Sequence, residues 1–258
     1  MKGSEEVRRS VKKLGSSHEA ERESTFKTLS LGIKELDEGL GGGVPHPSLI
    51  SIEGEHGAGK TVLTQQIVHS ALRNGLKVCV VTTEARVKEY LSMMSSIKLD
   101  AYNHFIQGKL KIYPLHVKGG KWSGQMLSLF LKVAEVFLER YKGKYDVVAI
   151  DSLSILTTET KHNDFLTFIT RAKNIVSNGK TVILTFHPNF VSDDLMMEIK
   201  ASSDAYLIIR NVKISGINVK ALEVIKLWGS AGERRGPITL EVNPQLGLRV
   251  VPLGGVKI

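Results

Sequence analysis

The chain has 258 residues, of which 42% are hydrophobic and 24% charged, and it carries a formal net charge of +9. These proportions are typical of a globular protein with a sizeable core; no apolar run reaches the roughly 20 residues that a membrane-spanning helix needs. The N-terminal segment lacks the apolar core of a secretory signal, and Cys79 is the single cysteine, so we expect a cytoplasmic protein without an internal disulfide.

The first 24 residues mix basic and acidic side chains and contain few large apolar ones. Val7, Val11 and Leu14 share helical spacing, but a helix this short buries too little surface to be stable alone. We predict a flexible tail over residues 1–24, which can fold on a partner, and a single domain over residues 25–258.

From Phe26 onward, apolar strands alternate with amphipathic helices. Ser48–Glu53 is predicted to be a strand and Lys60–Asn74 a helix that Gly75 ends. Further strands are predicted at Lys77–Thr83, Lys109–Leu115, Asp146–Ile150 and Lys180–Phe186, and further helices at Ser123–Tyr141 and Asp164–Asn178. This alternation predicts an α/β fold, in which a mostly parallel sheet is covered by helices on both faces.

The last quarter of the chain has strand patterning and no long helix. Ala205–Trp228 contains a turn signal at Ser215–Gly216, and short strands are predicted within Gly236–Val242 and Leu246–Leu253. We predict C-terminal antiparallel strands that extend one edge of the sheet.

The segment GEHGAGKTV, between the first strand and the first helix, has the spacing and the context of a phosphate-binding P-loop. Its glycines let backbone N–H groups turn inward around phosphates, and the helix N-terminus adds partial positive charge. Lys60 is expected to reach the β- and γ-phosphates, and the Thr61 hydroxyl to coordinate Mg²⁺. The predicted nucleotide-binding residues are Gly54, Glu55, His56, Gly57, Ala58, Gly59, Lys60, Thr61 and Val62.

A second metal-orienting carboxylate is expected at the end of a neighbouring buried strand. Asp151 follows the apolar run Val147–Ile150, where an ionised carboxylate is costly unless a cation or hydrogen bonds compensate. We predict that Thr61 and Asp151 hold Mg²⁺, with a helix N-cap as the alternative role of Asp151. Asp146 is interpreted as a turn residue.

Five segments in chain order resemble the KaiC-like branch of the RecA ATPase superfamily, and within it the archaellum ATP-binding (FlaH/ArlH) family. They are LDEGLGGGVP (Leu36–Pro45), GEHGAGKT (Gly54–Thr61), VTTE (Val81–Glu84), IDSLS (Ile150–Ser154) and FHP (Phe186–Pro188). The ending Val224–Leu253 is similar to the same family, so the resemblance covers about residues 26–258. It implies a RecA-like domain that binds ATP with Mg²⁺ and forms hexameric rings.

The resemblance also implies a place at the cytoplasmic base of the archaellum, the rotary motility filament of archaea. The implied partners, besides further copies of the chain, are the motor ATPase of that filament, its polytopic membrane platform protein and a surrounding scaffold ring protein. The chain would then be peripheral to the membrane through these partners.

Two positions depart from the pattern of hydrolysing KaiC-type enzymes. These enzymes carry paired glutamates after the second strand, whereas this chain has Glu84 followed by Ala85. Glu84 is the candidate base for the attacking water, with a carboxylate that has no catalytic role as the alternative. The family's late KxRG segment, which reaches a neighbouring subunit's γ-phosphate, has Lys226 as candidate contact but Trp228 in the arginine position. A missing arginine finger can cost about 10³–10⁵ in rate, so we hypothesise ATP binding with slow or no hydrolysis.

Other residues near the γ-phosphate leave alternatives open. Arg234 or Arg235 could replace the missing arginine, and His187 is a candidate γ-phosphate sensor or a histidine satisfied in a strand-end turn. A KaiC-like autophosphorylation is a further alternative, for which the nearby hydroxyls belong to Ser152, Ser154, Thr157 and Thr158.

The strongest rival from another class is a RecA- or RadA-like DNA recombinase, which the positive charge would suit. Binding along single strands of DNA needs a basic groove with stacking aromatic side chains. Aromatic residues make up only 6% of this chain, and Lys118–Trp122 is the segment most similar to such a DNA-binding site. The basic residues are otherwise scattered, so we expect no nucleic-acid partner. A third hypothesis is that the chain is a protein-interaction module whose P-loop no longer binds nucleotide.

Overall fold

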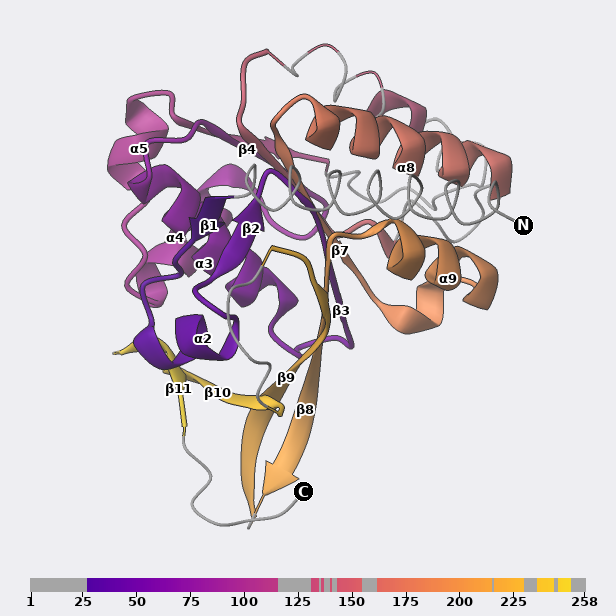
Figure 1. Cartoon of the computed structure of the whole chain (residues 1–258). Coiled ribbons are helices and arrows are strands. Elements are labelled where there is room, and N and C mark those ends of the chain that lie inside the picture. The colour runs from indigo at the N-terminus through magenta and orange to yellow at the C-terminus, as the bar shows by residue number, and fades with distance from the viewer. Residues whose placement is uncertain are drawn as a thin grey trace, which may run out of the picture.

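The computed structural model describes residues 27–115, 131–134, 136, 140, 143–154, 162–214, 216–229, 236–243 and 246–251. Its elements (Figure 1) are β1 (Lys27–Leu29), α2 (Lys34–Gly39), β2 (Val44–His46), β3 (Leu49–Gly54), α3 (Lys60–Arg73), β4 (Val78–Thr82), α4 (Val87–Ser96), α5 (Tyr102–Ile106), β5 (Leu110–Pro114), β6 (Val147–Asp151), α8 (His162–Ser177), β7 (Thr181–Phe186), the 3₁₀ helix η1 (Pro188–Phe190), α9 (Asp193–Ser202), β8 (Ala205–Ile214), β9 (Ile217–Leu227), β10 (Ile238–Asn243) and β11 (Gly247–Val250). Several predictions lie outside the described residues: the tail, most of the helix Ser123–Tyr141, Lys118–Trp122, Thr157, Thr158, Arg234 and Arg235.

In the described part of the chain, nine strands form one sheet in the order β11-β10-β9-β8-β3-β7-β6-β4-β5. The strands from β8 to β5 in this order run parallel to their neighbours, whereas β9, β10 and β11 are paired antiparallel. β1 and β2 form a separate antiparallel pair. The predicted mostly parallel sheet with antiparallel strands at one edge is therefore confirmed.

Helices cover both faces of the sheet, which is why its central strands are apolar along their whole length. Figure 1 shows α3, α4 and α5 on one side and α8 and α9 on the other. Successive side chains of β3 point to opposite faces: Ile50 and Ile52 join the apolar cluster under α3, and Leu49 joins the cluster under α8. None of the described helices is long and apolar enough to cross a membrane.

Within the described residues, the helices α3 and α8 and the apolar strands match their predicted positions within two residues. α3 ends at Arg73, followed by Gly75 at φ +80°, as predicted from the glycine. The short helices α4, α5 and α9 were not predicted. α9 buries only Leu195 and Ile199, one turn apart, so it lacks the repeated apolar spacing that identifies a helix from sequence. α4 was missed although Val87, Tyr90, Leu91 and Met94 have helical spacing and pack in the apolar cluster under α3.

The carboxyl ends of the parallel strands meet at one edge of the sheet, where ligands bind in open α/β folds. The register aligns Glu53 with Phe186 and Thr82 with Asp151, which places the ends of β3, β7, β6 and β4 side by side. One prediction was wrong in a detail: the strand that carries Asp151 is not the direct neighbour of β3, because β7 lies between them. This edge holds the candidate site.

Candidate nucleotide-binding site

The P-loop turns sharply between β3 and α3. At Gly54 a Cβ atom would lie 2.6 Å from the carbonyl oxygen of Ile209 on β8, so only glycine allows the two strands to approach this closely. Gly57 and Gly59 have φ of +69° and +108°, in the region that favours glycine. Gly59 is the N-cap of α3 and supplies no side-chain cap, which leaves the first N–H groups of the helix available to an anion.

Lys60 is a buried cation, 7% exposed, whose ammonium group lies inside the loop. Its Nζ donates hydrogen bonds to the carbonyl oxygens of Gly54 (2.7 Å) and Glu55 (2.9 Å). Burial lowers the pKa of Lys60, while the negative charges of Glu84, Asp151 and Glu55 act in the opposite direction. The loop therefore holds a positive charge where the predicted phosphates would lie.

Asp151 is fully buried at the end of β6. The Thr185 hydroxyl on β7 donates to Oδ1 (2.7 Å), while Oδ2 has no hydrogen-bond partner in the described part of the chain. Burial raises the pKa of Asp151 to about 6 and the charge of Glu84 acts in the same direction, whereas the Thr185 and Thr61 hydroxyls and Lys60 lower it. An orphaned carboxylate oxygen close to the Thr61 hydroxyl fits a hydrated divalent cation.

The bond to Thr185 does not support the N-cap alternative for Asp151, because the carboxylate is bonded to a neighbouring strand. The described residues contain no group of three or more His, Cys, Asp or Glu side chains that could hold a metal alone. This agrees with Mg²⁺, which usually binds through one or two protein ligands together with phosphate oxygens and water. Asp146 lies in the bend before β6, in line with its interpretation as a turn residue, and also contacts the starts of two neighbouring strands. It accepts from the N–H of Lys77, just before β4 (2.9 Å), and forms an ion pair with Lys180, just before β7 (2.8 Å).

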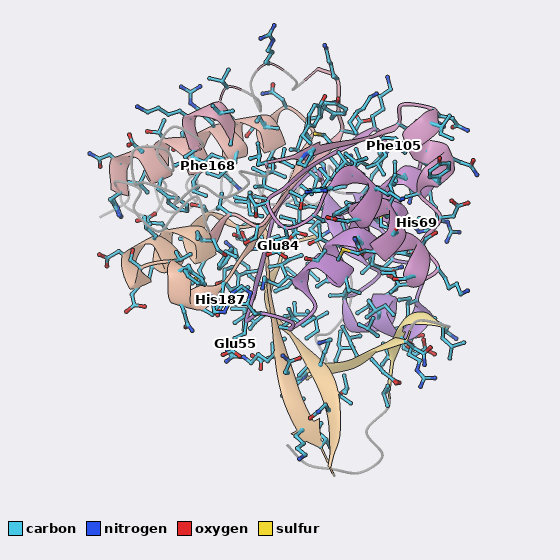
Figure 2. All side chains as sticks on the ribbon, turned by 180° about the vertical axis from the view of Figure 1, so that it is seen from behind. Glu55, His69, Glu84, Phe105, Phe168 and His187 are labelled. Atoms are coloured by element: carbon cyan, nitrogen blue, oxygen red, sulfur yellow. The ribbon has the colours of Figure 1, made fainter. Side chains whose placement is uncertain are left out.

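Glu84 and Ala85 follow β4 at the same edge but lie in different environments. The Glu84 side chain is exposed, and its charge influences the pKa of both Lys60 and Asp151, so it faces the site. Figure 2 shows Glu84, His187 and Glu55 along the middle of the molecule. Ala85 is 6% exposed and packs in the apolar cluster under α3 and α4, so the position of the second KaiC-type glutamate is here a core position.

His187 follows β7, which is the direct neighbour of β6. Its N–H donates to Ser154 Oγ (2.6 Å), and its Nδ1 accepts from Asn189 N–H (3.2 Å), so the proton of the neutral ring is on Nε2. Burial lowers the pKa of His187, and nearby His56 and Lys60 lower it further, whereas Glu55 raises it. In that tautomer Nε2–H is the donor of the ring, which contacts the ring of His56 in the loop.

His56 is exposed, as expected for its place in the loop, but its ring also contacts other rings. The centroids of His56 and His187 are 4.6 Å apart, and that of Phe190 in η1 lies 5.1 Å from His187. The P-loop is thus in contact with the segment that follows β7.

The hydroxyls of Ser152 and Ser154 are buried and bonded to each other at 2.9 Å. Ser154 Oγ also accepts from His187 N–H, and Thr83 Oγ1 accepts from Ser152 N–H (3.2 Å). These contacts connect the ends of β4, β6 and β7. Both serines therefore serve the packing of the site edge, which does not favour them as phosphorylation sites.

Lys226 is not brought to the P-loop of its own chain. Its Nζ donates to the carbonyl oxygen of Ala201 at the end of α9 (3.0 Å) and lies 5.3 Å from the ring centroid of Trp228, which is 47% exposed. Burial lowers the pKa of Lys226, whereas Asp204 raises it. A role at the γ-phosphate therefore requires another copy of the chain.

Two residues at the site were not predicted from the sequence. Thr185 supports Asp151, and its signal is weak: a hydroxyl within the apolar strand β7. Lys220 on β9 donates to the carbonyl oxygen of Gly57 in the P-loop (2.6 Å). No local pattern marks it, because the two residues are distant in the sequence.

The comparisons with known proteins agree on one family of ATPases. The family model described as "ATPase: KaiC" matches residues 29–254. The archaeal flagellar ATP-binding protein FlaH of Sulfolobus acidocaldarius is 38% identical over 226 residues, which cover 87% of this chain and 97% of that protein. FlaH of Methanocaldococcus jannaschii is 28% identical, with coverage of 86% and 94%. The circadian clock oscillator protein KaiC of Prochlorococcus marinus is 28% identical over 88% of this chain but only 44% of its own length.

Among solved structures, the chain is similar to the crystal structure of the flagellar accessory protein FlaH from Methanocaldococcus jannaschii. The TM-score is 0.74 with 24% identity, and the match covers 88% of this chain and 99% of that one. At this identity the likeness shows the fold, which agrees with the sheet order and the P-loop described above.

Proposed function

The chain belongs to the KaiC family of ATPases and, within it, to the archaeal FlaH proteins, and from this premise we propose that it is an ATP-binding protein of the archaellum. ATP with Mg²⁺ would bind at the carboxyl edge of the sheet. The observation that carries the proposal is the buried set of Lys60, Asp151 and Thr185 beside a glycine loop that presents backbone N–H groups.

The roles of the residues follow from their surroundings. The N–H groups of Gly57 to Val62 and the Lys60 ammonium would bind the phosphates, and the Thr61 hydroxyl and Asp151 would hold the metal, directly or through water. When bound, Mg²⁺ neutralises phosphate charge. His187 presents Nε2–H toward the loop, which supports its role as γ-phosphate sensor.

We propose further that ATP is bound with slow or no hydrolysis. The second KaiC-type glutamate position holds Ala85 in the core, and Trp228 stands where the family has an arginine. In the described part of the chain, Glu84 is the carboxylate left to orient water, and Lys60 is the cation whose charge lowers the pKa of both Asp151 and His187. Hydrolysis would therefore lack the charge stabilisation that accelerates phosphoryl transfer.

Binding without rapid turnover would act by shifting assembly. A ligand stabilises whichever oligomeric state contacts it best, so ATP would favour a ring in which Lys226 of one copy reaches the nucleotide of the next. The proposed ring is hexameric, and its proposed partners are the archaellum motor ATPase, the membrane platform protein and the scaffold ring protein.

Two measurements on the purified protein test this function: mass by light scattering with and without Mg²⁺–ATP, and steady-state phosphate release. We expect a larger assembly with ATP and phosphate release well below about 1 s⁻¹, the low end of ordinary enzymes. Release at that rate or faster, abolished in Lys60→Ala, would contradict slow turnover. Failure to bind ATP at millimolar concentration would indicate that the P-loop no longer binds nucleotide.

A recombinase would bind single-stranded DNA with affinity that falls steeply as salt rises, because phosphate contacts release counterions. An archaellum component is expected to show little such binding. Titration of labelled single-stranded DNA at two salt concentrations separates the two functions.

A further inference from the structure

A second lysine contacts the P-loop from outside its own motif. Lys220 Nζ donates to the carbonyl oxygen of Gly57 (2.6 Å) and to Oδ1 of Asn211 (3.0 Å), its partner in the pairing of β8 with β9. The side chain is half-buried, and burial lowers the pKa of Lys220. Its ammonium is thus committed to a loop carbonyl and a neighbouring amide and is not a freely solvated surface charge.

The aliphatic part of the same side chain packs on the loop. A Cβ atom at Gly59 would lie 3.0 Å from Cδ of Lys220 and 3.3 Å from Cδ1 of Ile209 on β8. A side chain at Gly59 would therefore crowd Lys220 and Ile209, besides having to adopt the positive φ of this position. The loop and the hairpin are packed together on both sides of the Gly57 carbonyl.

Two lysines bind carbonyl oxygens of the loop, Lys60 from inside it and Lys220 from the hairpin of β8 and β9. Lys60 accounts for those of Gly54 and Glu55, and Lys220 for that of Gly57. Because a peptide unit is planar, a bond that holds its carbonyl also fixes the direction of its N–H group. The bond from Lys220 holds the peptide between Gly57 and Ala58, whose N–H group closes the turn of the loop by donating to the Glu55 carbonyl.

We propose that Lys220 is a positioning residue that holds the P-loop in its phosphate-binding conformation and couples it to the hairpin of β8 and β9. The proposal rests on the proposed function in that the loop binds nucleotide, and it adds a control on that binding from the hairpin whose strand β8 pairs with β3. Figure 1 shows this hairpin projecting beyond the helical layers, so a change at the hairpin would reach the loop through Lys220.

The alternative is that Lys220 only stabilises the hairpin through Asn211, with the contact to Gly57 incidental. Lys220→Met keeps the aliphatic stem against Gly59 and removes the ammonium, whereas Lys220→Arg keeps a positive charge and hydrogen-bond donors. Lys213→Met is the matched control, because Lys213 is an exposed lysine on β8 of the same hairpin.

The first readout needs no nucleotide. Hydrogen–deuterium exchange of peptides covering residues 54–63 reports on the bond from Ala58 N–H to the Glu55 carbonyl, which closes the loop turn (3.2 Å). We expect faster exchange there in Lys220→Met, with Lys220→Arg and Lys213→Met close to the unaltered chain. Exchange in Lys220→Met that matches the unaltered chain would overturn the proposal, whether or not nucleotide binds.

The second readout is the equilibrium affinity for fluorescent ATP and ADP analogues with Mg²⁺. Loss of a charge-assisted hydrogen bond predicts affinity about tenfold weaker in Lys220→Met. Lys220→Arg should restore it to within about threefold, and Lys213→Met should leave it unchanged, since surface charges contribute little. Unaltered affinity in Lys220→Met would overturn the coupling to binding. A chain that binds no nucleotide at all would refute the proposed function, while the exchange readout would still decide the role of Lys220.

Discussion

The two ends of the candidate site are built differently. At the P-loop, Lys60 and Asp151 are buried and held by contacts within one chain. At the positions where hydrolysing relatives are expected to act on the γ-phosphate, Glu84 and Trp228 are exposed and Lys226 is bonded to the end of α9. The fold of one chain therefore holds the P-loop groups in place by itself, whereas Glu84 and Trp228 have no such burial and Lys226 is directed elsewhere.

Preparation matters because groups held in place before a ligand arrives cost no reorganisation when it binds. Burial makes this placement strict at the P-loop end: each buried polar atom needs a partner, and the partner sets its position. Exposed side chains at the other end have no such constraint. Four substitutions test the contrast.

Lys60→Ala should have the largest effect on binding, because it removes the cation around which the loop carbonyls are arranged. We expect ATP affinity to fall by about 100-fold or more, from the loss of a buried charged hydrogen-bonding group. Isothermal titration calorimetry measures it, with Lys88→Ala on the exposed face of α4 as control. Affinity equal to that of the unaltered chain would show that the P-loop end is not the binding end.

Asp151→Asn should remove most of the benefit of Mg²⁺ while leaving the fold intact. In the unaltered chain, ATP should bind more tightly with Mg²⁺ than with a chelator. In the variant, this ratio of the two affinities should be about 10-fold to 100-fold smaller. Burial raises the pKa of Asp151 to about 6, because the charged carboxylate is costly inside the protein. Its neutral replacement should therefore not lower thermal stability. An undiminished response to Mg²⁺ would place the metal ligand elsewhere.

Ala85→Glu tests whether the hydrolysis end lacks only a carboxylate. Because Ala85 lies in the apolar cluster, a glutamate there should destabilise the fold by about 2 kcal/mol or more without raising phosphate release. Urea unfolding and a release assay measure the two quantities, and Arg86→Glu at the next, exposed position is the control. A stable variant that hydrolyses ATP rapidly would break the contrast between the two ends.

Thr185→Val should have the smallest effect. Valine keeps the shape of the side chain but removes the hydroxyl that donates to Asp151 Oδ1, a loss of about 1 kcal/mol or roughly fivefold in the Mg²⁺-dependent affinity. The same titrations measure it, and Thr170→Val, which removes a hydroxyl bond on the exposed side of α8, should change nothing. If both variants behave alike, Thr185 does not support Asp151.

Much of the fold follows from local patterns. The helix α3 and the strands β3, β4, β6 and β7 were predicted because each is long or apolar enough to carry its own signal. The short helices α5 and α9 escaped prediction, since they bury at most two residues of their own and depend on the sheet beneath them. α4 was missed although its apolar residues Val87, Tyr90, Leu91 and Met94 have helical spacing. The place of β7 between β3 and β6 was equally invisible, because strand order is a matter of pairing between distant segments.

The sequence by itself determined the P-loop and its chemistry: the spacing of Gly54, Gly59 and Lys60 specifies a backbone turn and a cation that any such segment would form between a strand and a helix. It also identified Asp151, since a carboxylate that ends an apolar strand needs a compensating partner. Only the tertiary structure decided what surrounds these residues. The bond from Thr185, the core packing of Ala85 and the contact of Lys220 with Gly57 all join residues from different strands or helices. Contacts of this kind depend on the register of the sheet and the packing of its faces, which no local pattern contains.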